Sequence, residues 1–123
     1  MPDRTLRGCH ILVVEDEFLL AGDLQAELSD AEAVVLGPVG TLEEALDLVR
    51  SAERIDGAIL DINLGGEAAY PVADLLIQRG VPLVFTSGYD GTSFPSRFAA
   101  IARCEKPISI SLITQAIGRA IHV

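Results

Sequence analysis

Short apolar runs alternate with longer amphipathic segments along the chain. The apolar runs cover residues 10–14, 33–36, 57–61, 81–86 and 101–104. Between the first two runs, Leu20, Leu24 and Leu28 recur at the spacing of one helix face. Strands that are apolar on both faces and are separated by helices are typical of a parallel sheet covered on both sides. The pattern therefore predicts an α/β fold with a doubly wound sheet of five strands and about five helices.

Turn and capping residues predict where several of these elements begin and end. Gly37 and Pro38 predict the end of the second strand. Thr41 and Glu44 have the spacing of a capping box, which predicts a helix that begins just after Thr41. Residues 88–96 are rich in turn formers, so any helix between the fourth and fifth strands should be short or irregular.

Composition narrows the class of protein. The length of 123 residues suits one domain, residues 1–123, with no separate output domain. There is neither an apolar run long enough to span a membrane nor a signal-peptide core, so we expect a cytoplasmic protein without membrane contact. Acidic residues outnumber basic ones by 18 to 9, which argues against binding to nucleic acid. Cys9 and Cys104 lack metal-site spacing and are expected to be buried, reduced thiols.

Polar residues that do not suit a core occur at the carboxyl ends of the predicted strands. Glu15 and Asp16 end the first strand, Asp61 ends the third, and Ser87 and Lys106 follow the fourth and fifth. In a doubly wound parallel sheet these ends meet at one edge, where ligands bind. An acidic residue in such a place is often only a helix cap or a solvated charge. The joint occurrence of all five residues favours a functional site.

The three carboxylates predict a cation site. Close carboxylates repel one another, so one stays protonated or a cation lies among them. A hard divalent ion with oxygen ligands, Mg²⁺ in a cell, fits best. Asp16, Glu15 and Asp61 would hold the ion directly or through water, and the main-chain carbonyl of Asn63 would supply a further ligand.

Asp61 is also the candidate for chemistry. A carboxylate beside a metal ion and an ammonium group can attack phosphorus, because both cations neutralise the charge on the phosphoryl oxygens. Lys106 would pair with Asp61 at rest and with the phosphoryl group afterwards. Ser87 would donate its hydroxyl to a phosphoryl oxygen. The added charge and acceptors would then pull a nearby loop into a new position.

With these residues the sequence resembles the receiver domain of two-component response regulators over essentially the whole chain. Four segments match the signature regions of that family in order and spacing, namely residues 11–17, 59–64, 82–88 and 105–107. The resemblance implies a flavodoxin-like fold with strand order 2-1-3-4-5 and a Lys106–Pro107 peptide bond that can be cis. It also implies phosphotransfer from a histidine kinase or a histidine phosphotransfer protein. The receiver would catalyse only its own phosphorylation and dephosphorylation, as a monomer or weak dimer.

Residues 61–67, 70–74 and 85–89 look like those of the single-domain FATGUY subgroup of alphaproteobacteria. That motif makes Ser87, rather than its neighbour Thr86, the switch hydroxyl. One position departs from common receivers, because Arg103 stands where an aromatic residue usually reports phosphorylation. The aromatic residues nearby are candidates for that role, with simple packing as the alternative: Tyr89, Phe94 and Phe98.

Two other functions compete with the receiver switch. A haloacid-dehalogenase-like phosphatase also uses an aspartate, a lysine and Mg²⁺, but its Asp-x-Asp motif follows the first strand, and here the third strand ends in Asp61-Ile-Asn63. A phosphorylation-independent interaction module would not need the carboxylate cluster. In a receiver, the output would be a protein contact or onward phosphotransfer. Phe18 and Leu19 are candidates for contact with a phosphodonor, and closing the sheet edge is the alternative.

Overall fold

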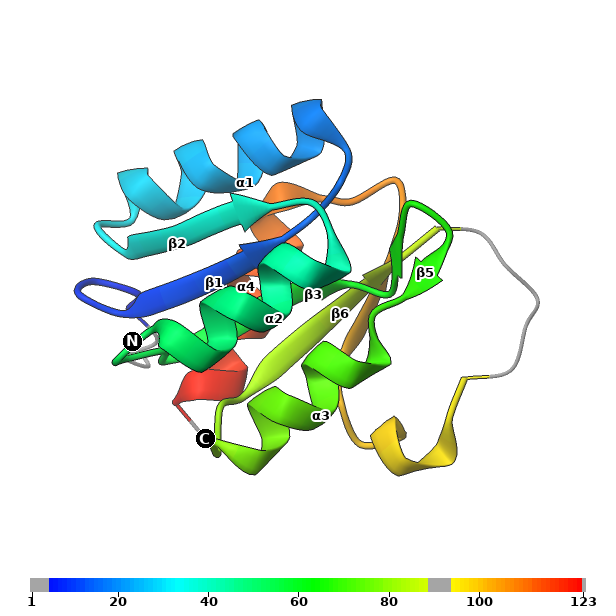
Figure 1. Cartoon of the computed structure of the whole chain (residues 1–123). Coiled ribbons are helices and arrows are strands. Elements are labelled where there is room, and N and C mark those ends of the chain that lie inside the picture. Colours follow the sequence, from blue (N-terminus) through cyan, green and yellow to red (C-terminus); the bar gives the residue numbers. More distant parts are fainter. Residues whose placement is uncertain (1–4, 89–93, 123) are drawn as a thin grey trace.

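A parallel sheet forms the centre of the molecule in the computed structural model, which describes residues 5–88 and 94–122 (Figure 1). Its strands are β1 (His10–Val14), β2 (Val34–Val39), β3 (Gly57–Asp61), β6 (Leu83–Ser87) and β7 (Arg103–Glu105). They lie in the order β2-β1-β3-β6-β7, and each neighbouring pair is parallel. This arrangement confirms the predicted doubly wound sheet and its 2-1-3-4-5 strand order.

Two helices cover each face of the sheet (Figure 1). The helices α2 (Leu42–Ser51) and α3 (Tyr70–Gln78) pack on one face, and α1 (Phe18–Asp30) and α4 (Ile110–Ile121) pack on the other. Alternate residues of β1 therefore enter different cores, Leu12 on the α2 and α3 side and Val13 on the α1 and α4 side. Burial on both faces explains why the strands appear in the sequence as nearly continuous apolar runs.

The second strand extends beyond its predicted end. β2 passes through Gly37 and Pro38 by a bulge, because Leu12 of β1 pairs with Leu36 whereas Val14 pairs with Val39. Proline is tolerated here because β2 is an edge strand, where the missing N–H is not needed by a further strand. Beyond the bulge, the carbonyl of Val39 accepts a hydrogen bond of 2.9 Å from the N–H of Glu15.

A short hairpin follows β3 that the sequence pattern does not predict. Strands β4 (Asn63–Leu64) and β5 (Glu67–Ala68) pair in antiparallel fashion. The turn between them consists of Gly65 and Gly66, which both have positive φ, as two-residue hairpin turns with the right twist require. The hairpin lies beside the carboxyl ends of β3 and β6 (Figure 1).

The start of α2 and the connection between β6 and β7 agree with the sequence pattern, whereas the burial of the cysteines does not. Thr41 caps α2 by accepting a hydrogen bond of 3.1 Å from the N–H of Glu44, as predicted. Only one turn of 3₁₀ helix, η1 (Ser96–Phe98), lies in the described part of the connection between β6 and β7. Both cysteine side chains are free thiols but half-buried rather than buried. Among the described residues, no helix is both long and apolar enough to cross a membrane.

The bulge in β2 predicts a strong effect of a small substitution. In Gly37→Ala the new methyl group would lie 2.9 Å from both the Val13 carbonyl oxygen and the Val39 amide nitrogen, at a φ of +94°. We expect the free energy of unfolding to fall by at least about 2 kcal/mol in urea titrations. Gly22→Ala is the control, because Gly22 lies in α1 with open space around it and should gain about 0.5–1 kcal/mol. Equal effects of the two substitutions would contradict this account of the bulge.

Candidate functional site

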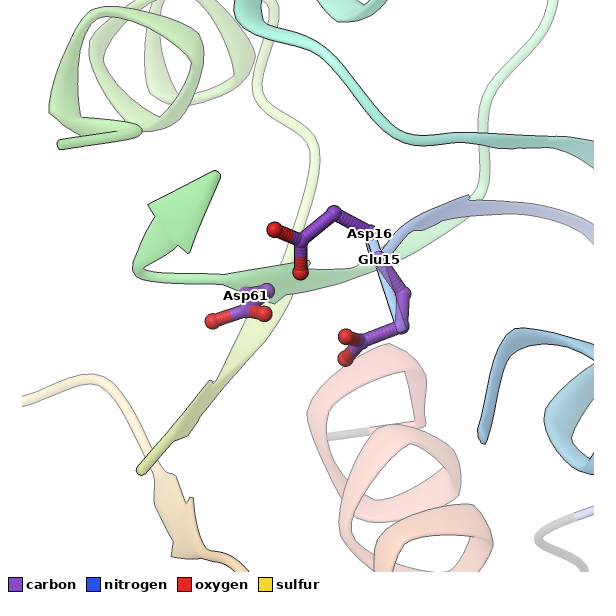
Figure 2. A group of neighbouring side chains, drawn as sticks. All are labelled: Glu15, Asp16 and Asp61. Atoms are coloured by element: carbon purple, nitrogen blue, oxygen red, sulfur yellow. The ribbon is translucent and has the colours of Figure 1, made fainter. Parts of the chain in front are cut away.

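Carboxylates from two adjacent strands meet at the carboxyl edge of the sheet. Glu15 and Asp16 follow β1 and Asp61 ends β3, and Figure 2 shows the three side chains turned toward one another. One oxygen atom from each lies within 4.8 Å of the others. Glu15 and Asp61 are buried, whereas Asp16 is exposed. The parallel sheet thus brings together residues that are 45 positions or more apart in the sequence.

The ammonium group of Lys106 lies among the carboxylate groups of the site. Its Nζ donates hydrogen bonds of 3.0 Å to Oδ2 of Asp61, 3.1 Å to Oε2 of Glu15 and 3.2 Å to Oε2 of Glu17. The peptide bond between Lys106 and Pro107 is cis, in agreement with the expectation from the receiver resemblance. The structure therefore places Lys106 against Asp61, and it adds Glu17, which the sequence analysis does not assign to the site.

Burial and hydrogen bonding change the proton affinity of this cluster. Burial raises the pKa of Glu15 to about 7; the N–H of Glu17 opposes the rise, and the charge of Asp61 adds to it. For Lys106, burial lowers the pKa, but the hydrogen bonds to Asp61 and Glu15 outweigh burial and leave the pKa above its ordinary value. Lys106 is therefore an ammonium ion at neutral pH.

The hairpin that follows β3 holds two of the carboxylates in place. The N–H of Asn63 donates to Oδ1 of Asp61 at 3.1 Å, and the N–H of Gly65 donates to Oδ2 of Asp16 at 2.8 Å. Within the hairpin, the side-chain oxygen of Asn63 accepts a hydrogen bond of 2.8 Å from the N–H of Gly66. One backbone segment thus links a carboxylate of β3 to a carboxylate that follows β1.

The two neighbouring hydroxyl residues of β6 have different surroundings. Ser87 is half-buried and lines an open pocket of ≈ 390 Å³, together with Asp16, Asp61, Asn63 and Lys106. Thr86 is fully buried, and its Oγ1 has no hydrogen-bond partner in the structure. Of these two residues, Ser87 is the one that lines the pocket.

The aromatic residues of the connection between β6 and β7 pack together. Phe94 lies edge-on to Phe85 with ring centroids 5.3 Å apart, and Phe98 is fully buried. The guanidinium of Arg103 lies 4.5 Å from the centroid of the Phe94 ring, so this residue takes part in a cation–π contact. Packing accounts for the positions of Phe94 and Phe98, and Tyr89 lies outside the described residues.

The donor set fits a hard divalent cation. Its ligand atoms are carboxylate oxygens, which Mg²⁺ prefers over nitrogen or sulfur. Oε1 of Glu15 is buried and has no hydrogen-bond partner in the structure. Glu15, Asp16 and Asp61 would hold such an ion, whose charge would offset the repulsion among them.

Removal of the ammonium group from this cluster should destabilise the fold. In Lys106→Met, the buried carboxylates of Glu15 and Asp61 lose their common partner, and we expect the free energy of unfolding to fall by about 3 kcal/mol without divalent ions. Mg²⁺ should restore part of the loss, because it supplies positive charge to the same carboxylates. The exposed pair of Arg7 and Glu32 provides the control Arg7→Met, which should leave stability nearly unchanged. A Lys106→Met protein as stable as the wild type would contradict this reading of the site.

Known proteins resemble this chain in both sequence and structure, although no protein-family model matches it. The solution structure of SdrG from Sphingomonas melonis Fr1 has 38% sequence identity and a TM-score of 0.80, and the match covers 94% of this chain and 98% of SdrG. SdrG has also been solved in its BeF3-activated conformation, with 38% identity, a TM-score of 0.73, and coverage of 91% of this chain and 95% of that one.

Two further similar proteins are named as regulators. A response regulator receiver protein from Sinorhizobium medicae has 25% identity and a TM-score of 0.80, with 96% of this chain and 98% of that chain covered. The phyllosphere-induced regulator PhyR of Methylorubrum extorquens is 31% identical over 119 residues, which are 90% of this chain. The chain spans 43% of the length of PhyR. With the sheet order and the acidic cluster described above, these similarities show that the chain belongs to the receiver domains of response regulators.

Proposed function

We propose that this receiver accepts a phosphoryl group on Asp61 with Mg²⁺ bound beside it. One observation carries the proposal: the buried carboxylate of Asp61 lies 3.0 Å from the ammonium of Lys106, within a cluster that also holds Glu15 and Asp16. Support comes from SdrG, whose activated structure was obtained with BeF3. A nucleophile, a cation site and a phosphoryl-binding ammonium are what phosphoryl transfer needs.

Each residue of the site has a part in the proposed step. An oxygen of Asp61 forms a bond to phosphorus while the bond from phosphorus to the donor breaks, and the leaving group keeps the electron pair. Lys106 and the hydroxyl of Ser87 donate hydrogen bonds to the phosphoryl oxygens. Glu15, Asp16 and Asp61, together with the main-chain carbonyl of Asn63, would hold Mg²⁺, which would neutralise charge on the phosphoryl group.

The wider role follows from the receiver family. The donor would be a histidine kinase or a histidine phosphotransfer protein, and the receiver would add no catalysis beyond its own phosphorylation and dephosphorylation. We propose that the chain belongs to the FATGUY subgroup, because residues 85–89 resemble the motif of that subgroup. Output would be a protein contact or onward phosphotransfer from a single domain, as a monomer or weak dimer.

Intact-mass measurement tests the phosphoryl acceptor. With Mg²⁺ and acetyl phosphate, the wild-type protein should gain one phosphoryl group, and Asp61→Asn should gain none because the amide cannot act as the nucleophile. Asp23→Asn on α1 is the control, since its exposed carboxylate lies on a helix outside the pocket and its loss should leave the adduct unchanged. The proposal fails if the wild-type protein gains no group from acetyl phosphate or a cognate kinase, or if Asp61→Asn gains one.

The start of α1 supplies a surface for the phosphodonor. Phe18 and Leu19 have exposed fractions of 88% and 77%, so neither closes the sheet edge, and both follow the acidic residues directly in the chain. Large apolar side chains so exposed beside a reaction site favour contact with a partner. We therefore propose that Phe18 or Leu19 packs against the helical bundle of the histidine protein.

Substitution of one of these residues separates docking from chemistry. Leu19→Glu should slow phosphotransfer from the kinase about tenfold, as expected for the loss of a central apolar contact. Phosphorylation by acetyl phosphate should be unaffected, because that donor needs no docking surface. Ile77→Glu on α3 changes another exposed apolar side chain on the opposite face of the sheet and should affect neither rate. Equal slowing with both donors would contradict the docking role.

A further inference from the structure

The ammonium group of Lys106 donates hydrogen bonds to three carboxylates, so all of its N–H donors are in use. An ammonium group has three N–H donors, and its partners are Asp61, Glu15 and Glu17 at 3.0–3.2 Å. When a phosphodonor binds and Asp61 is still a carboxylate, Lys106 has to donate to a phosphoryl oxygen as well. One of the three existing hydrogen bonds must then be given up.

The three partners differ in how much water reaches them. The side chains of Glu15 and Asp61 are 1% and 3% exposed, whereas the side chain of Glu17 is 61% exposed. A buried carboxylate that loses its hydrogen bond has no water to replace the donor, which is costly, but an exposed carboxylate is rehydrated at once. The hydrogen bond to Glu17 is therefore the one that Lys106 can release most easily.

Glu17 stays close to the site after release. It is the N-cap residue of α1, and its carbonyl accepts a hydrogen bond of 2.9 Å from the N–H of Ala21. Its own N–H donates to Oε2 of Glu15 at 2.9 Å. The carbonyl and the N–H of Glu17 are both hydrogen-bonded, so its backbone is fixed. The carboxylate can therefore rotate away from Lys106, but its charge remains near the position of the phosphoryl group.

We propose that Glu17 is a positioning residue that holds Lys106 in the unphosphorylated state and competes with the phosphoryl group for it. This inference rests on the proposed phosphorylation of Asp61. Glu17 acts in two ways: its hydrogen bond occupies the third donor of Lys106, and its charge repels an incoming anion. It therefore lowers the affinity of the site for phosphoryl groups and favours more weakly charged phosphodonors.

Three variants separate these two effects. Glu17→Gln removes the charge and keeps the side-chain length, whereas Glu17→Asp keeps the charge but shortens the reach toward Lys106. Glu27→Gln is the control, because it removes an exposed carboxylate from α1 well beyond the first turn. Each protein is assayed at saturating Mg²⁺ for its dissociation constant with beryllofluoride and for its initial rate of phosphorylation by acetyl phosphate and by phosphoramidate.

We expect Glu17→Gln to bind beryllofluoride roughly three- to tenfold more tightly than the wild type, as the loss of one nearby screened charge implies. Its rate should increase more with acetyl phosphate, the more negative donor, than with phosphoramidate. Glu17→Asp should lie between Glu17→Gln and the wild type. A purely structural role would change stability in urea but not the ratio of the two donor rates.

The result also distinguishes this inference from the proposed function. If the wild-type protein forms an adduct or a beryllofluoride complex but Glu17→Gln behaves as the wild type, the role of Glu17 is wrong and phosphorylation of Asp61 stands. An equal gain in Glu27→Gln also overturns the role, because it shows an effect of overall charge. A wild-type protein that forms neither product overturns the proposed function and this inference together.

Discussion

The ammonium group of Lys106 is the interaction on which the site depends. It is bonded to carboxylates that come from the end of β1, the start of α1 and the end of β3, and two of them are buried. Without a positive charge among them, these groups would repel one another at a place where little water screens the repulsion. One side chain thus stabilises the edge of the sheet and leaves a concentration of negative charge suited to a divalent ion.

The fold supplies the geometry through strand ends and two irregular features. The bulge at Gly37 lets β2 continue to Val39, whose carbonyl binds the N–H of Glu15. The hairpin after β3 then ties Asp61 and Asp16 through two backbone N–H groups, one from Asn63 and one from Gly65. The bulge thus holds the backbone of Glu15, and the hairpin holds the carboxylate groups of Asp16 and Asp61.

The main parts of the site can be predicted from the sequence because each follows an apolar run. Asp61 comes directly after Ala-Ile-Leu, where a continuing buried strand would not carry a charge, and Lys106 follows the last short strand. The alternation of strands and helices likewise predicts the sheet and its parallel character. Such signals lie in short stretches of sequence, so they can be recognised without knowledge of the tertiary structure.

The features that escape prediction depend on contacts between distant segments. Gly37 and Pro38 indicate a strand end unless β2 is known to be an edge strand, where proline is tolerated. The strands of the hairpin have two residues each, too few to show any alternation. Glu17 is an exposed acid in an acidic run, and its partner Lys106 lies 89 positions away, so no neighbouring residue in the sequence points to that contact.

A crystal structure of the protein with Mg²⁺ and beryllofluoride tests the central claim most directly, because it shows all partners of Lys106 at once. We expect beryllofluoride on an oxygen of Asp61, with Lys106 Nζ bonded to a fluoride and no longer to Glu17. The Mg²⁺ ion should be held by Glu15, Asp16 and Asp61 with the main-chain carbonyl of Asn63, directly or through water. A structure with beryllofluoride absent from Asp61 under saturating conditions, or with Lys106 directed away from it, would contradict the account.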